Sequence, residues 1–170
     1  MLQLIRLFLD IALWRKGPQD VPASRVVLVI AVVFYLVVST LQLIVSEQDQ
    51  TRFLMGLVVD PLLIAAWIWM VLAIFGRQAR FEQTLAAIFG TYALLSILLL
   101  FLQFAQGAFD LPDALLTTTV LAWIVAFLLV TGRIVMLALD RGLLTGAAVM
   151  VTYILVSFAV SSALAPAAAA

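Results

Sequence analysis

The sequence predicts an all-α integral membrane protein, in which five transmembrane helices form a bundle and an N-terminal amphipathic helix lies along the membrane surface. Of its 170 residues, 66% are hydrophobic and only 11% are charged, whereas a soluble domain is about half apolar and a quarter charged. The apolar residues fall into five long blocks, and most of the charged residues stand between them. A helix needs about 20 apolar residues to cross the hydrocarbon core of a bilayer, and each block has that length.

Residues 1–16 are predicted to form the amphipathic interfacial helix. Gln3, Arg6 and Asp10 recur at helical spacing along one face, while leucine, isoleucine and phenylalanine cover the other faces. A helix of this length is too short to cross the bilayer, and its mixture of charged and apolar surface is typical of helices that lie among the headgroups. Residues 17–25 contain two prolines and are expected to be a linker.

The transmembrane domain is expected to occupy residues 26–165, and residues 166–170 are expected to form a disordered tail. The five predicted spans are residues 26–45, 53–75, 81–104, 114–139 and 143–163. A second interpretation has four spans, with the segment around Asp60 and Pro61 entering and leaving the membrane on the same side.

The basic residues are distributed unevenly over the two ends of the predicted helices. Eight of the nine fall at the same end as the N-terminus, and the ninth, Arg52, falls at the other end. The eight are Arg6, Arg15, Lys16, Arg25, Arg77, Arg80, Arg133 and Arg141. Cytoplasmic loops carry the excess of Lys and Arg in membrane proteins, so we expect the N-terminus in the cytoplasm and the C-terminus on the opposite side.

Asp60 is an acidic residue well inside a predicted span, and an ionisable group at such a depth suggests a site for an ion, a proton or a ligand. The structural alternative is that Asp60 caps a helix that restarts at Pro61, because Asp is favoured at the N-cap and Pro at the first helical position. We expect Ser39 or Tyr35 to hydrogen-bond its carboxyl group. The polar residues expected to gather in this intramembrane cluster are Asp60, Tyr35, Ser39, Gln42, Thr117 and Thr118.

A second set of charged residues falls where the third predicted span begins and the fourth ends. This set, the charged rim, consists of Arg77, Arg80, Glu82, Arg133, Asp140 and Arg141, and we expect it on the cytoplasmic side. Arg133 is expected either to extend to the lipid headgroups or to pair with Glu82. The rim fixes topology and anchors the protein to lipid on one interpretation, and it is a docking patch for a partner on the other.

Two pairs of small residues stand four positions apart, Ala86 with Gly90 and Gly142 with Gly146. Small residues at this spacing allow membrane helices to approach closely. In a five-span bundle we expect them to make contacts within the chain rather than a dimer interface.

Cysteine and histidine are both absent from the chain. Their absence removes disulfides, thiolate nucleophiles, imidazole bases and the usual ligands of zinc, haem and iron–sulfur clusters. No second acidic residue is placed to form an aspartyl dyad with Asp60. We therefore expect no enzyme activity, no cofactor and no bound metal. The net charge is zero, so there is no basic field to attract nucleic acid.

The run from Gly76 to Ala86 reads GRQARFEQTLA, and Gly90-Thr91-Tyr92-Ala93 follows it. Together with the amphipathic segment and the sequence PQDVP before the first span, this run resembles the Yip-type family of small five-span membrane proteins, which includes the Ypt/Rab-interacting proteins. The resemblance implies five helical spans and a cytoplasmic N-terminus. Eukaryotic members act in vesicle traffic through small GTPases, but this chain lacks their long hydrophilic N-terminal region, and that role is not carried over. Its alanine- and leucine-rich composition looks bacterial, which implies the inner membrane and a periplasmic C-terminus.

Two functional hypotheses remain open. In the first, the protein is a non-enzymatic scaffold or assembly partner whose contacts are the lipid bilayer, another membrane or cytoplasmic protein, or further copies of itself. In the second, it is a small transport or permeation unit that uses Asp60 as its polar site and works as an oligomer. An Asp60 that lies in a polar path favours transport, and an Asp60 sealed by packing favours the scaffold.

Overall fold

The computed structural model describes residues 2–45, 55–109 and 112–164. Within these ranges the chain is helical and has no strand, which confirms the all-α prediction. Five helices are long and apolar enough to cross a membrane, so the chain is a multi-pass membrane protein. The elements are α1 (Leu2–Ala12), η1 (Pro18–Asp20), α2 (Arg25–Val45), η2 (Met55–Val59), α4 (Asp60–Ile74), η3 (Gln78–Arg80), α5 (Phe81–Phe109), α6 (Asp113–Leu139) and α7 (Leu143–Leu164).

Helix α5 is the centre of the bundle. Every residue from Thr84 to Thr91 is buried, and α1, α2, α4 and α6 all pack against this helix. The hydroxyl groups of Thr84 and Thr91 donate hydrogen bonds to carbonyl oxygens one turn earlier, Thr84 to Arg80 of η3 and Thr91 to Ala87 of α5. Because no polar group of these threonines is left unpaired, the central helix can be surrounded by other helices on all sides.

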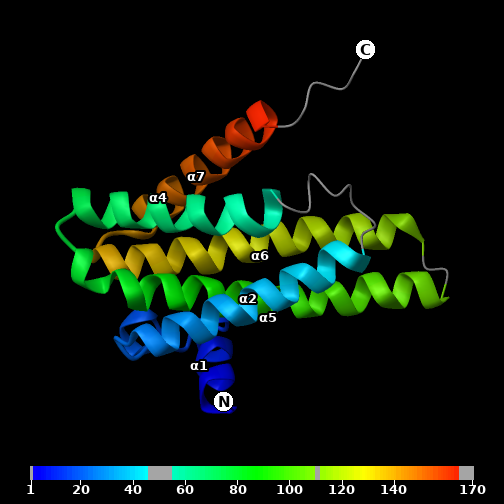
Figure 1. Ribbon diagram of the computed structural model, residues 1–170, viewed down its shortest axis with the longest axis horizontal. Coiled ribbons are helices and arrows are strands. Elements are labelled where there is room, and N and C mark those ends of the chain that lie inside the picture. The colour runs from blue at the N-terminus through cyan, green and yellow to red at the C-terminus, as the bar shows by residue number, and fades with distance from the viewer. Residues whose placement is uncertain (1, 46–54, 110–111, 165–170) are drawn as a thin grey trace.

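Helix α1 crosses the direction of the spanning helices and packs against the bundle (Figure 1). Phe8 is 2% exposed and Ile11 is 1% exposed. A Cβ atom on Gly90 of α5 would lie 2.6 Å from the Phe8 ring, so the absence of a side chain there makes room for that ring. The opposite side of α1 keeps leucine and isoleucine side chains exposed. The helix expected at the membrane surface is thus also a packed part of the fold.

The segment expected to be a linker is packed as well. Gly17, Pro18 and Val21 are buried, and the Asp20 carboxylate accepts a hydrogen bond from the Gly17 N–H at 2.8 Å. The side-chain amide of Gln83 on α5 donates to the Val21 carbonyl at 2.7 Å. These bonds fix the turn between α1 and α2 against the central helix.

Helices α6 and α7 cross where Gly132 and Gly146 are both buried. A Cβ atom on Gly146 would collide with the Gly132 carbonyl oxygen and with Met136. Gly142 has open space around it instead. Each pair therefore contributes to a contact within the chain, as the sequence predicted, through Gly90 in the first pair and Gly146 in the second.

Helix α7 then leaves the other helices at an angle (Figure 1). Tyr153 is buried near its middle, and beyond it Leu155 and Phe158 are exposed.

Candidate functional site

Asp60 is the first residue of α4, and Pro61 follows it in the first turn. The chain enters α4 directly from the π-helical turn η2, and Val59, which precedes Asp60, already has helical angles of φ −71° and ψ −46°. No side-chain hydrogen bond caps the helix at this point. The interpretation of Asp60 as an N-cap is therefore wrong, because the preceding turn is itself helical and carries Pro61 without a break. Turns of the π type are frequent at functional sites.

Asp60 has electrostatic partners on three other helices. Asp60 interacts electrostatically with Tyr35 of α2, Tyr92 of α5 and Tyr153 of α7. These are all the tyrosines in the chain. In the described part of the protein, Asp60 makes no hydrogen bond and no ion pair, so the hydrogen bond expected from Ser39 or Tyr35 is not formed.

The tyrosine rings belong to a wider group of aromatic side chains. The centroids of Tyr35 and Tyr92 are 4.9 Å apart, and Tyr92 meets Trp123 of α6 at 5.4 Å with its edge toward the ring. Trp67 of α4 lies 6.4 Å from Tyr153. Edge-on and tilted contacts at these separations are favourable. We call Asp60, Tyr35, Trp67, Tyr92, Trp123 and Tyr153 the aromatic centre, to which all five spanning helices contribute.

Several polar atoms near the aromatic centre are buried without a hydrogen-bond partner. Ser39 is 6% exposed and Ser96 is 0% exposed, yet neither hydroxyl group is paired. Each stands one turn after a tyrosine of its own helix, Tyr35 or Tyr92. The indole N–H groups of Trp67 and Trp123 are unpaired too. An unpaired buried polar group costs about 1–3 kcal/mol, so the presence of several such groups in one part of the bundle needs an explanation.

The structure brings together only part of the predicted intramembrane cluster. Tyr35 and Ser39 lie at the aromatic centre with Asp60, whereas Thr117 and Thr118 are exposed. Thr118 donates to the Ala114 carbonyl of its own helix at 2.7 Å. Gln42 is half-buried, nearer the end of α2 than Ser39.

Sequence reasoning missed Tyr92, Tyr153, Trp67 and Trp123. One signal pointed to the first two, because all three tyrosines of the chain fall inside predicted spans.

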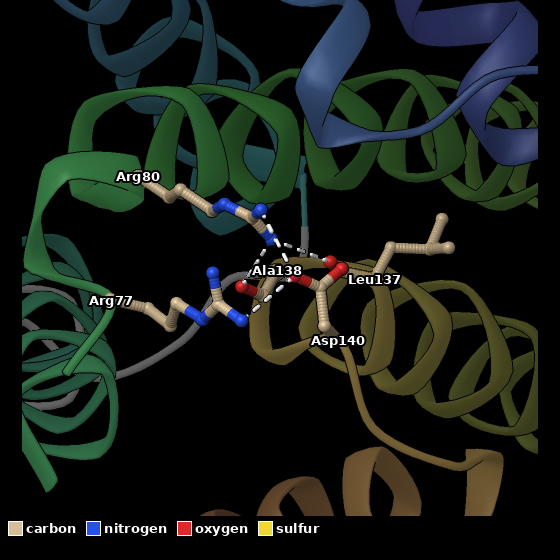
Figure 2. A network of polar contacts seen from close by, with 5 residues as sticks. All are labelled: Arg77, Arg80, Leu137, Ala138 and Asp140. Carbon is tan, nitrogen blue, oxygen red and sulfur yellow. Dashed lines mark hydrogen bonds and ion pairs between the residues drawn. The ribbon is translucent and has the colours of Figure 1, made fainter. Parts of the chain in front are cut away.

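In the charged rim, the connection between α4 and α5 is joined to the end of α6 (Figure 2). The Asp140 carboxylate forms ion pairs with Arg77 at 3.1 Å and with Arg80 at 3.0 Å. Arg80 also donates to the carbonyl oxygens of Leu137 and Ala138, at 3.2 and 3.0 Å. The last carbonyl groups of a helix have no partner within it, so Arg80 of η3 satisfies the end of α6. The hydrogen bond from Arg80, with the charges of Arg80 and Arg77, lowers the pKa of Asp140.

Arg133 is held by the segment that follows α1. It donates to the carbonyl oxygens of Trp14 and Lys16, both at 2.9 Å, and its guanidinium group lies 5.4 Å from the centre of the Trp14 ring. Trp14 has a left-handed backbone, with φ 65°. This turn presents two free carbonyl groups to α6, and the expected pairing of Arg133 with Glu82 is therefore wrong.

The remaining charges of the rim have separate partners. Glu82 pairs with Arg25 at 3.4 Å, in an exposed position. Arg141 lies over the ring of Phe75 at 5.7 Å. With Arg77, Arg80 and Arg133 bound to Asp140 or to backbone carbonyl groups, the rim residues mainly hold helices of this chain together.

The described part of the chain has no group of three acidic, histidine or cysteine side chains placed to hold a metal ion. No protein-family model, curated protein or solved structure matches the chain.

Proposed function

We propose that this chain is a non-enzymatic scaffold of the bacterial inner membrane, with its charged rim toward the cytoplasm, and that it assembles with a second copy of itself through α7. The five-span architecture and the GRQARFEQTLA run support membership of the Yip-type family. The observation that carries the assembly role is the exposed face of α7 beyond its crossing with α6.

This face has the spacing of a helix-pairing surface. Its residues are all exposed and recur in alternating steps of four and three: Leu144, Ala148, Val151, Leu155, Phe158 and Ser162. A repeat of 3.5 residues on average keeps one stripe facing a partner helix along its length. In lipid, apolar surface alone does not drive association, so close packing has to do so. Ala148 and Ser162 supply small side chains that permit close approach, and a two-fold arrangement makes the stripe its own partner.

Disulfide crosslinking tests this assembly without interference, because the chain has no cysteine. Leu155→Cys, oxidised in native membranes, is expected to give a product of twice the 18.5 kDa chain mass. Leu121→Cys is the matched control, since Leu121 of α6 is 58% exposed and Leu155 is 64% exposed. No dimer from Leu155→Cys, or equal amounts from both variants, contradicts the proposal. An adduct of another mass assigns α7 to a different membrane protein.

A second candidate function is a small transport unit, and the unpaired Asp60 favours it. An ionisable carboxyl group inside a membrane span is typical of ion and substrate pathways. The test is flux of protons or small cations into proteoliposomes containing the purified chain. Flux that persists in Asp60→Asn, or that is absent from the native chain, rules out this candidate.

A further inference from the structure

Helix α1 has an exposed apolar stripe on the side away from the bundle. Its residues recur in steps of three and four, and each is between 44 and 75% exposed. This outer stripe consists of Leu2, Ile5, Leu9 and Leu13. The N–H of Leu13 bonds the Leu9 carbonyl at 2.9 Å, so the helical repeat continues to the end of the stripe.

The polar residues of α1 lie between the outer stripe and the face that packs on the bundle. At 3.6 residues per turn, Gln3, Arg6 and Asp10 fall between the outer stripe and the buried side chains of Phe8 and Ile11. The helix thus has one face for the bundle, one apolar face turned away from it, and a polar face beside both. A helix at the boundary between acyl chains and headgroups needs this arrangement when it lies beside a bundle.

The contacts of α1 place it at that boundary. Phe8 lies at Gly90, nine residues into α5, and Arg133, which binds the carbonyl groups of Trp14 and Lys16, stands six residues before the end of α6. At 1.5 Å per residue, these levels are about 9–14 Å from the helix ends. The 29 residues of α5 extend about 44 Å, more than the hydrocarbon thickness of about 30 Å, so the helix ends lie outside the hydrocarbon. Because α1 also crosses the direction of the spans (Figure 1), it lies in the membrane plane near the headgroups.

The end of the bundle that carries α1 has an excess of positive charge. Eight basic residues and four acidic ones belong to this end, an excess of four positive charges. The acidic four are Asp10, Asp20, Glu82 and Asp140. Each of these carboxylates already has an ion pair or a hydrogen bond within the chain. The excess of positive charge therefore has to be matched by anions outside the chain.

Arg6 and Arg15 are the basic residues with their side chains left for such an anion. Both are exposed, and among the described residues neither side chain forms an ion pair or a hydrogen bond. Arg6 stands on the polar face next to the outer stripe, and Arg15 follows the end of the stripe. A guanidinium group matches the geometry of a phosphate group. Unpaired arginines beside an exposed apolar stripe match both parts of an anionic phospholipid, its headgroup and its acyl chains, whereas a soluble anion would leave the stripe uncovered.

We propose that α1 binds anionic phospholipids of the cytoplasmic leaflet, with Arg6 and Arg15 at the headgroup phosphates and the outer stripe along the acyl chains. This surface goes beyond the assembly role of α7, because it selects a class of lipid. The crosslinking of α7 tests the assembly separately, so either proposal is rejected without the other.

Native mass spectrometry of the purified full chain in nonionic detergent tests the selection. Phosphatidylglycerol and phosphatidylcholine with the same acyl chains are added in equal amounts, and the phosphatidylglycerol adducts are expected to exceed the others by at least about tenfold. Arg6→Gln and Arg15→Gln are each expected to reduce this preference by about fivefold, the effect of one basic residue near an anionic surface. Arg141→Gln removes the same charge from the same end but lies over Phe75, and it is expected to leave the preference unchanged.

Spin labels test the placement of the outer stripe in lipid bilayers, since the chain has no other cysteine to label. A nitroxide at Leu9→Cys is expected to be relaxed mainly by dissolved oxygen, which concentrates in the hydrocarbon. A nitroxide at Gln3→Cys, on the polar face, is expected to be relaxed mainly by a water-soluble nickel complex.

Four results overturn the proposal. Two concern selection: equal adducts of the two lipids, or an unchanged preference in both arginine variants. Displacement of the lipid by an equal concentration of inorganic phosphate assigns the arginines to a soluble anion instead. A Leu9→Cys label that is reached by the nickel complex, or protected from both agents, places the stripe in water or in a protein contact.

Discussion

Gly146 sets how closely α6 and α7 approach each other. A methyl group at this position meets the backbone of α6 at Gly132 and Met136, and backbone cannot rotate away as a side chain can. We expect Gly146→Ala to destabilise the protein by about 1–3 kcal/mol, the usual cost of overpacking. The measurement is unfolding in mixed micelles, followed by circular dichroism.

Gly142→Ala provides the matched control, because it changes the other glycine of the same pair and meets nothing within 4 Å. Its effect is expected to be within about 0.5 kcal/mol. Equal effects of the two substitutions contradict the assignment of Gly146 as the crossing point.

Because Asp140 can be protonated, we expect the stability that the charged rim contributes to the fold to depend on pH. Its pKa is lower in the folded protein than in the unfolded chain, chiefly because Arg80 donates a hydrogen bond to its carboxylate. This carboxylate therefore stabilises the fold at pH values above about 4, and its contribution is lost as the pH falls through the folded pKa. We expect the melting temperature to fall on acidification through this range, and to fall less in Asp140→Asn.

The comparison uses thermal melts of both chains between pH 6 and pH 3, values that bracket the ordinary pKa of about 3.9 for Asp. Because the side chain is half exposed, the difference is expected to be small and to shrink in high salt. Identical pH profiles for the two chains contradict a stabilising role for this ion pair.

At the scale of the element, two side-chain contacts attach α1 to the rest of the bundle, one beyond its C-terminal end and one near its middle. Arg133 binds two carbonyl groups after the helix, and Phe8 lies against Gly90. We expect Arg133→Gln to loosen the end of α1 and to raise the rate of trypsin cleavage after Arg15 and Lys16 by about tenfold. The reason is that hydrogen bonds to a charged group contribute about 1.5–3 kcal/mol, and cleavage follows the population of the open form.

Arg141→Gln is the control for that experiment, since Arg141 lies over Phe75 and not over α1. Mass spectrometry identifies the N-terminal fragment. An unchanged cleavage rate in Arg133→Gln is the outcome that contradicts the attachment of α1 by Arg133.

At the scale of the whole molecule, the sequence predicted the number and order of helices because each apolar block meets a length requirement that acts locally. It also identified Asp60, since a charge inside an apolar block is visible without any tertiary contact. It did not identify Tyr92 or Tyr153 as electrostatic partners of Asp60, because the rotation of each helix about its axis is set by packing across the bundle. The erroneous pairing of Arg133 with Glu82 has the same origin. The true partners, Trp14 and Lys16, lie 119 and 117 positions away in the chain.

The orientation of the bundle is the last property that follows from its charges. Basic residues gather at the end where α1, the α4–α5 connection and the α6–α7 connection meet, and the rim pairs tie these connections together. The continuous apolar helix from Gly56 to Ile74 is long enough to cross, which favours five spans over a re-entrant segment at Asp60. An odd number of spans with basic connections inside places the C-terminus outside. We therefore expect a reporter that works only in the periplasm to be active when it is fused after Ala170. A reporter that works only in the cytoplasm is expected to be active when it is fused after Gly76. A cytoplasmic signal after Ala170 contradicts the five-span topology, because an even number of crossings then has to follow the cytoplasmic N-terminus.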